Sequence, residues 1–168
     1  RFDKRYGRAV KEHPVFRRPE ALLSEAPLLL GLDGEKMSKS RGNTIALRMS
    51  ADETAKALKK AKTDSDRVIT YDPAARPEVS NLLMLASLCG AGAPEEIADR
   101  IGDGGAGTLK KVATEAVNEF FAPIRARRAE LTADEDHLLQ VLRGGNERAN
   151  EVAERTLADV RTAMHMDY

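Results

Sequence analysis

Residues 109–124 read Leu-Lys-Lys-Val-Ala-Thr-Glu-Ala-Val-Asn-Glu-Phe-Phe-Ala-Pro-Ile. Apolar side chains recur in this stretch at the three- and four-residue spacing of a helix. The positions that share this face are Leu109, Val112, Ala116, Val117, Phe120 and Ile124. A helix with one apolar face is stable only when that face packs against other elements. The stretch therefore predicts a long amphipathic helix that belongs to a helical core.

Other segments after residue 50 also have helical patterns. Ser50 and Glu53 form a capping box, in which each side chain can satisfy an amide of the other residue. The helix that this box opens is expected to end near Lys62, and further helices are expected at 77–90 and 94–101. The glycine-rich residues 102–107 lack the lysine of a phosphate-binding P-loop, so we interpret them as a turn between helices.

The C-terminal part of the chain has a second possible helix start. Thr132 and Glu135 match the capping box again and predict a helix that ends at Gly144 and Gly145. A last helix is expected to carry an apolar stripe from Ala149 to Met164. With no convincing strand after Leu47, the sequence predicts a mainly α protein built as a helical bundle.

The first 34 residues are punctuated by proline and glycine and predict loops with little regular structure. We expect a short helix at 20–25 and a short apolar strand at 28–32, which the Asp33-Gly34 turn would close. Residues 1–6 are interpreted as the tail of a helix, which indicates that the chain is a piece of a larger protein.

Composition and charge narrow the functional classes. The chain has 168 residues, and its 27 Lys and Arg residues balance 27 Asp and Glu residues, so any nucleic-acid partner must be met by local basic patches. A single cysteine, Cys89, excludes an intramolecular disulfide, and no Cys/His spacing suggests zinc. The apolar run 26–32 is too short to span a bilayer, so a cytoplasmic protein without membrane contact is expected.

The residues most suited to chemistry are Lys36-Met37-Ser38-Lys39-Ser40, which run on through Arg41-Gly42-Asn43. Lys36 and Lys39 place two compact positive charges on a short loop. The small residues around them allow close approach to a polyphosphate. Such charges can stabilise the negative charge that develops on a leaving pyrophosphate.

All five residues from Lys36 to Ser40 match the KMSKS signature of class I aminoacyl-tRNA synthetases. The continuation resembles tryptophanyl-tRNA synthetases in particular, through Thr63-Asp64-Ser65, Tyr71-Asp72 and Ser80-Asn81-Leu82-Leu83. Phe121-Ala122-Pro123-Ile124-Arg125 and Asn146-Glu147-Arg148-Ala149-Asn150 also lie where that family has similar segments. The resemblance covers nearly the whole chain.

The resemblance implies a fold and a division of the chain. Residues 1–50 would be the C-terminal remnant of a Rossmann-like class I catalytic domain, and residues 51–168 would be a helical domain that binds the tRNA anticodon. The implied reaction is the ATP-dependent activation of tryptophan to tryptophanyl-adenylate, followed by transfer to tRNA(Trp). The full enzyme would be a homodimer, and Mg²⁺ would accompany the ATP.

The resemblance also implies roles for the loop residues. Lys36 and Lys39 would contact the ATP phosphates as the catalytic residues, and Lys39 would have the larger effect on the transition state. Met37 and Ser38 would lie near the adenine and the phosphates, and Ser40 and Asn43 would order the loop. These six residues are the candidate nucleotide-binding set, and no metal ligand is expected among them.

The family's HIGH-type motif and its tryptophan pocket are not found in the 168 residues. We interpret His13, His137 and His165 as ordinary surface or packing residues, and we expect the isolated chain to be unable to form adenylate.

Candidate tRNA contacts are the basic residues Lys110, Lys111, Arg125, Arg127 and Arg128. Asp64 and Asp72 more readily turn the backbone than act in acid–base chemistry.

Two alternatives stay open at this point. A tyrosyl-tRNA synthetase would share the loop, although the stretch from Thr63 to Leu83 favours tryptophan. A non-catalytic helical tRNA-binding module could also have kept the loop as a relic.

Overall fold

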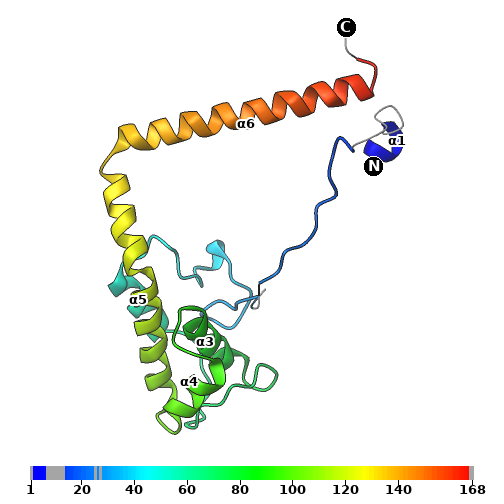
Figure 1. The fold of residues 1–168 in the computed structure, drawn as a ribbon. Coiled ribbons are helices and arrows are strands. Elements are labelled where there is room, and N and C mark those ends of the chain that lie inside the picture. Colours follow the sequence, from blue (N-terminus) through cyan, green and yellow to red (C-terminus); the bar gives the residue numbers. More distant parts are fainter. Residues whose placement is uncertain (1, 7–13, 25, 27, 167–168) are drawn as a thin grey trace. The chain divides into compact units, whose positions relative to one another are not determined.

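The protein is mainly α-helical, as the sequence predicts (Figure 1). The computed structural model describes residues 2–6, 14–24, 26 and 28–166. Its helices are α1 (Phe2–Tyr6), α2 (Ala51–Lys59), α3 (Pro77–Leu88), α4 (Pro94–Ile101), α5 (Gly105–Thr132) and α6 (Glu135–Ala163), with one 3-10 turn, η1 (Lys39–Arg41). Within these described residues the only β pairing is an isolated antiparallel bridge between Leu30 and Lys36. No helix of the described part is both long and apolar enough to cross a bilayer.

The chain divides into two compact units. One unit is Leu23–Ala129, and the other combines Arg1–Leu22 with Glu130–Tyr168. Residues 36–43 therefore belong to the same compact unit as α2, α3 and α4. The domain boundary expected between residues 50 and 51 stays a prediction.

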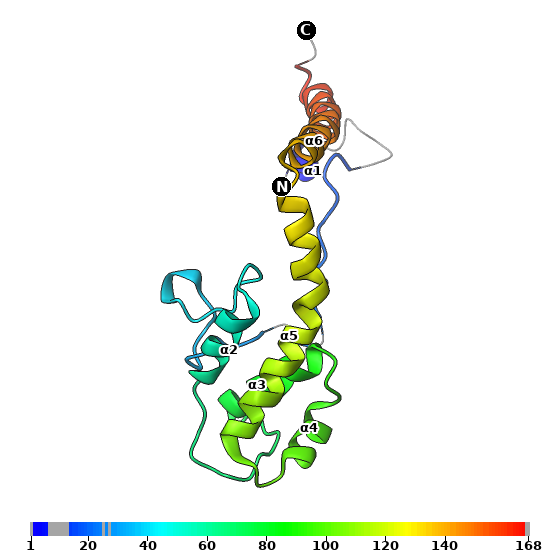
Figure 2. The same cartoon turned by 90° about the vertical axis from the view of Figure 1, so that its left-hand side faces the viewer.

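Helices α2 to α5 share the hydrophobic core of the unit Leu23–Ala129 (Figure 2). Each helix contributes at least one side chain that is no more than 1% exposed: Leu58 from α2, Val79, Leu82 and Leu83 from α3, Ile97 from α4, and Leu109 and Val117 from α5. The stripe predicted on 109–124 leaves the core toward its end, because Phe120 and Ile124 are 47% and 45% exposed.

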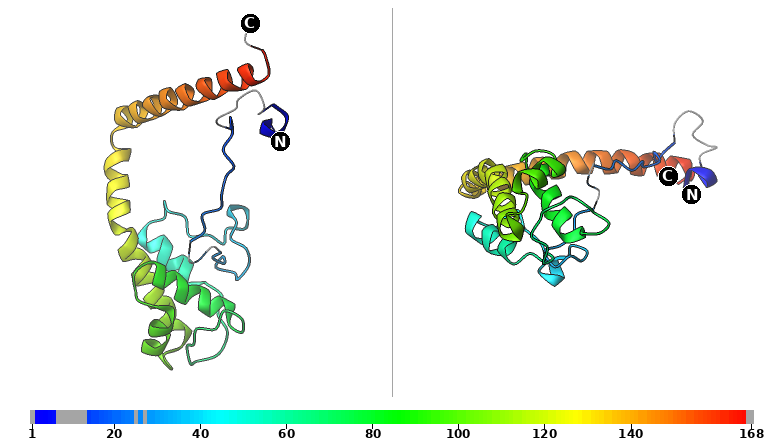
Figure 3. Two further views of the ribbon diagram at one scale, coloured as in Figure 1. Left: turned by 45° about the vertical axis from the view of Figure 1, so that its right-hand side comes forward. Right: turned by 90° about the horizontal axis from the view of Figure 1, so that it is seen from below.

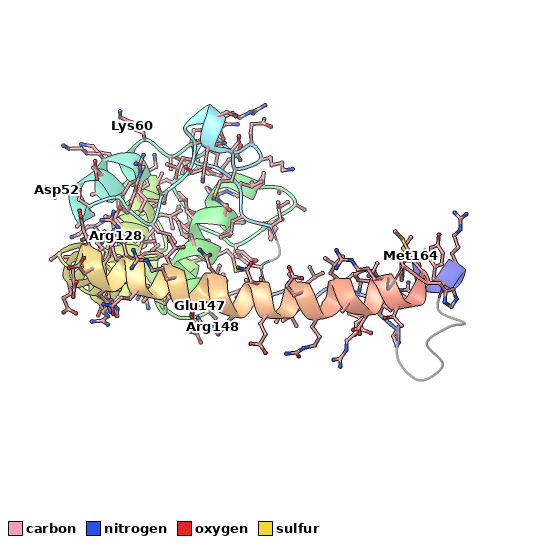
Figure 4. All side chains as sticks on the ribbon, turned by 90° about the horizontal axis from the view of Figure 1, so that it is seen from above. Asp52, Lys60, Arg128, Glu147, Arg148 and Met164 are labelled. Atoms are coloured by element: carbon pink, nitrogen blue, oxygen red, sulfur yellow. The ribbon has the colours of Figure 1, made fainter. Side chains whose placement is uncertain are left out.

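The capping box at the start of α2 is confirmed. The Ser50 hydroxyl accepts from the Glu53 amide at 3.2 Å, and the Glu53 carboxylate accepts from the Ser50 amide at 2.8 Å. The helix ends at Lys59 rather than near Lys62, because the Lys62 amide donates at 2.7 Å to the carbonyl of Leu32. Figure 4 shows Asp52 at the start of α2 and Lys60 just beyond its end.

Two elements expected before residue 34 are wrong. Residues 20–24 are not helical, and position 25 lies outside the described residues. Leu22 and Leu23 are 98% and 73% exposed, so a helix there would have no packing partner. The strand expected at 28–32 is reduced to the bridge at Leu30. The Asn81 side chain bonds both the amide and the carbonyl of Leu30, at 2.8 and 3.2 Å.

The C-terminal helices also differ from the prediction. Thr132 is still part of α5, so the true N-cap of α6 is Asp134, whose carboxylate accepts from the His137 amide at 2.9 Å. Helix α6 does not end at Gly144 and Gly145 but runs through them for 29 residues (Figure 3). A helical glycine costs only about 1 kcal/mol relative to alanine, which a helix of this length can tolerate.

Several connections match the sequence analysis. Helix α4 ends at Ile101 and α5 begins at Gly105, so residues 102–104 form the turn between helices, whereas residues 105–107 of the glycine-rich stretch already belong to α5. Asp64 accepts from the amide of Asp66, and Asp72 accepts from the amides of Ala74 and Ala75, which confirms that both carboxylates turn the backbone. Asp64 additionally binds the guanidinium of Arg76 through two bonds of 2.7 Å.

Replacing Leu83 by alanine should lower the free energy of unfolding by about 2–5 kcal/mol, because the side chain is fully buried and leaves a cavity. Chemical denaturation measures this loss. Leu88→Ala is the control, since Leu88 lies on the same helix and is 42% exposed. Equal losses for the two variants would contradict the proposed core.

Stability should also depend on the charge of Asp64. Hydrogen bonds from Arg76 lower the pKa of the Asp64 carboxyl below its ordinary value of 3.8. The carboxylate therefore stabilises the fold above pH 3.8, and this contribution is lost as the pH falls through the lower folded-state pKa. Denaturation of wild type and Asp64→Asn should show a stability gap at pH 7 that closes in strong acid. A gap that stays constant down to pH 2 would rule out this linkage.

Candidate functional site

The candidate site is built around residues 36–43, here called the signature loop. Lys36 pairs with Leu30 in the isolated bridge, and Lys39–Arg41 form the 3-10 turn η1. The turn closes at Gly42, whose amide donates to the carbonyl of Lys39 at 3.2 Å and whose φ is 66°. This left-handed conformation strains residues with a side chain, which explains a glycine at this position.

Asn43 holds the signature loop together from inside. Its side chain is 5% exposed, and its amide oxygen accepts from the Ser38 amide at 2.8 Å. Its amide nitrogen donates to the Asp33 carboxylate at 2.7 Å and to the Lys36 carbonyl at 3.2 Å. One buried side chain thus ties the start, the middle and the end of the loop.

Two residues before the loop complete this arrangement. A Cβ atom at Gly31 would collide with the side chain of Asn43, so only glycine leaves room for the amide. The hydrogen bond from Asn43 lowers the pKa of the Asp33 carboxyl, and the Glu35 amide also donates to that carboxyl at 3.0 Å. Asp33 therefore stays ionised and holds the amide in one orientation.

The segment that leads into the loop is fastened to α3. Asn81 on α3 bonds both backbone polar groups of Leu30. Glu78, also on α3, forms an ion pair of 2.7 Å with Lys62, and this contact lowers the pKa of the Glu78 carboxyl. The base of the loop is therefore fixed to the helical core.

The two lysines of the loop are left exposed. Lys36 and Lys39 both lie on the surface, and within the described part of the chain neither ammonium group has a hydrogen bond or an ion pair. Met37 is 40% exposed. Ser38 and Ser40 form a hydrogen bond of 2.8 Å between their hydroxyls. The polar contacts of Asn43 thus hold the loop backbone, and both lysine ammonium groups remain available to bind a ligand.

An open cavity of about 660 Å³ lies between the end of the signature loop and α2. Its lining residues are Leu32, Asp33, Arg41, Gly42, Asn43, Thr44, Met49, Glu53, Lys56, Ala57, Lys60 and Lys62. Of the six residues predicted to bind nucleotide, only Asn43 lines it. The lysine ammonium groups therefore belong to the outer surface of the loop and not to this cavity.

Sequence reasoning missed Asp33 and Gly31. Asp33-Gly34 was interpreted only as a turn that closes a strand, yet Asp33 is the residue that orients Asn43. An aspartate and an asparagine ten positions apart carry no sequence signal of their own contact. The close approach at Gly31 likewise depends on a side chain twelve residues further on.

The predicted tRNA contacts all lie on α5, and the structure gives partners to several of them. Lys110 donates to the carbonyl of Lys59 at 3.4 Å, and Lys111 lies 3.9 Å from the carboxylate of Glu115. The guanidinium of Arg125 is bonded inside the protein, to Met49, Thr54 and Asn118.

Comparison with known proteins finds, over most of the chain, the same family that the sequence resembles. The family model for tRNA synthetases class I (W and Y) matches residues 2–122. A tryptophan--tRNA ligase from Nostoc sp. is 39% identical over 160 residues, which cover 92% of this chain and 48% of the relative. One from Mycobacterium leprae is 42% identical over 128 residues, or 74% of this chain and 37% of the relative. The chain thus spans about half the length of the Nostoc relative, or less in the case of M. leprae.

Solved structures of tryptophanyl-tRNA synthetases are also similar to this chain. The tryptophanyl-tRNA synthetase from Campylobacter jejuni, complexed with ADP and tryptophan, has a TM-score of 0.68 at 27% identity. The match covers 97% of this chain and 50% of that structure. The tryptophanyl-tRNA synthetase from Mycoplasma pneumoniae has a TM-score of 0.75 at 22% identity, which supports the fold alone. The chain belongs to the family of class I tRNA synthetases specific for tryptophan and tyrosine.

Proposed function

We propose that this chain is the part of a tryptophan--tRNA ligase that brings the signature lysines to ATP and carries helices that bind tRNA(Trp). The observation that carries this proposal is the contrast inside the signature loop. Its backbone is pinned by the buried side chain of Asn43, whereas Lys36 and Lys39 are exposed and without partners among the described residues. Preorganised charge on a fixed backbone is what electrostatic catalysis requires.

In the proposed reaction, a carboxylate oxygen of tryptophan attacks the α-phosphorus of ATP. The bond from that phosphorus to the bridging oxygen breaks, and pyrophosphate leaves with additional negative charge. The ammonium groups of Lys36 and Lys39 would bind the departing phosphates, with Lys39 making the larger contribution to the transition state. A terminal hydroxyl of the tRNA then attacks the carbonyl carbon of the adenylate and loses its proton. The bond from that carbon to the phosphate oxygen breaks, AMP leaves, and the tryptophanyl group stays on the tRNA as an ester.

The remaining loop residues would shape the nucleotide site. Met37 and Ser38 would approach the adenine and the phosphates, and the bond between Ser38 and Ser40 would order the turn. Mg²⁺ would arrive with the ATP, because this ion is usually bound through the phosphate oxygens of the nucleotide and keeps several of its waters.

Tryptophan is the favoured amino acid for two reasons. The stretch from Thr63 to Leu83 resembles the tryptophan branch of the family. The similar proteins from Nostoc sp., Aquifex aeolicus and Synechocystis sp. are all named tryptophan--tRNA ligase. A cytoplasmic homodimer that binds tRNA through the helical region is the assembly that this function implies.

Replacing Lys39 by alanine in the full-length protein should slow adenylate formation by about 10²–10³, the effect of losing one charge-stabilising donor. Tryptophan-dependent exchange of pyrophosphate into ATP measures the rate, and tryptophan binding should be nearly unchanged. Lys59→Ala is the matched control, because Lys59 is an exposed lysine at the end of α2. A loss of tenfold or less for Lys39→Ala would argue against the assigned role.

The isolated 168 residues should not catalyse this exchange, because they contain no HIGH-type motif. The same assay, run with tryptophan and with tyrosine, tests this on the purified chain and on the full-length protein. Exchange by the isolated chain would refute the proposal that these residues cannot form adenylate by themselves. Exchange by the full-length protein with tyrosine and not with tryptophan would change the substrate assignment.

A further inference from the structure

Arg125, on α5, directs its guanidinium into the protein. Its Nε donates to the carbonyl of Met49 at 3.0 Å, and one terminal nitrogen donates to the hydroxyl of Thr54 at 3.0 Å. The other terminal nitrogen donates to the side-chain oxygen of Asn118 at 2.9 Å. The guanidinium thus joins α5 to the segment that follows the signature loop, which approaches α5 at the start of α2 (Figure 2).

The partners of Arg125 extend this contact to the neighbouring backbone. The Asn118 amide donates to the carbonyl of Ala51 at 3.2 Å. The hydroxyl of Thr54, whose side chain is fully buried, donates to the carbonyl of Ser50 at 2.9 Å. Three consecutive carbonyls, from Met49 to Ala51, are therefore held directly or indirectly from α5. We call Arg125 and Asn118 the α5 clamp.

The α5 clamp acts where the signature loop leaves its site. Met49 follows Asn43 by six residues, and both line the same 660 Å³ cavity. Asn43 fixes the loop from inside, and the clamp fixes the point at which the chain leaves that cavity for α2. A change at Met49 therefore alters the position from which the loop extends.

Arginine is suited to this role and poorly replaced. Its planar fork can bond a carbonyl, a hydroxyl and an amide oxygen at the same time, whereas a lysine offers a single point charge. The guanidinium carbon also lies 6.0 Å from the centre of the Phe121 ring, which helps to orient it. Because these contacts use all three nitrogens, the geometry does not favour a direct contact with RNA phosphates.

We propose that Arg125 is a positioning residue for adenylate formation, which holds the exit of the signature loop on α5 so that Lys36 and Lys39 reach the ATP phosphates. This inference rests on the proposed function. It links the long helix of the helical region to the loop that handles the nucleotide. Misplacement of a loop by about 1 Å can cost a hundredfold in rate, even when the altered residue is distant from the reacting atoms.

The test uses the full-length protein with Arg125→Met and Arg125→Lys, and with Arg143→Met as the matched control on the exposed surface of α6. Pyrophosphate exchange is measured without tRNA, with ATP and tryptophan varied separately. Arg125→Met should lower kcat/KM for ATP by about tenfold to hundredfold. The KM for tryptophan and the Kd for tRNA(Trp) should change by less than about twofold, and Arg125→Lys should restore little.

Other results would overturn the inference. Unchanged exchange together with weaker, more salt-dependent tRNA binding would make Arg125 an RNA contact instead. A KM for tryptophan that rises as much as the KM for ATP would indicate general damage to the fold. Should Arg125→Met fail to fold, Asn118→Ala removes only part of the α5 clamp and should lower kcat/KM for ATP by about threefold to tenfold; no loss in that variant would also refute the clamp. A wild-type protein without exchange would overturn the proposed function itself.

Discussion

The side-chain amide of Asn43 is the interaction on which the site depends. It is nearly buried, and its hydrogen bonds join Asp33, Lys36 and Ser38 across the whole signature loop. A buried amide is costly unless its donors and its acceptor are satisfied, so each of these bonds is needed. Because Asn43 forms the hydrogen bonds that hold the loop backbone, the side chains of Lys36 and Lys39 are not needed to stabilise the loop and remain exposed.

The helical core gives this loop a fixed base. The lead-in is held on α3 by Asn81, and the exit is held on α5 by Arg125. Helices α3 and α5 are in turn packed through buried side chains such as Leu83 and Leu109. Burial of apolar surface in the helices therefore supports the geometry of a polar loop that has no core of its own.

Local signals predicted most of this fold correctly. The box of Ser50 and Glu53 and the glycines after Ile101 depend on neighbours in sequence, so their outcome could be read from the sequence. Local signals failed at the start of α6, where Asp134 and not Thr132 is the N-cap, and at Gly144 and Gly145, which do not end the helix. Other errors arose where a distant partner decides the structure. The Asn81 side chain makes the backbone hydrogen bonds that a neighbouring strand would otherwise make with Leu30. The sequence near Leu30 does not indicate this contact. The roles that the KMSKS match gives to the loop residues stay predictions, and the match did not indicate that Asp33 orients Asn43 or that Arg125 faces inward.

The central claim is that the two exposed lysines of a pinned loop neutralise the leaving diphosphate. A crystal structure of the full-length protein with tryptophan and a non-hydrolysable ATP analogue tests this most directly. The account predicts that the Nζ of Lys39 lies within about 3.2 Å of a phosphate oxygen while the bonds of Asn43 remain intact. A triphosphate bound elsewhere, with both ammonium groups turned toward solvent, would contradict it.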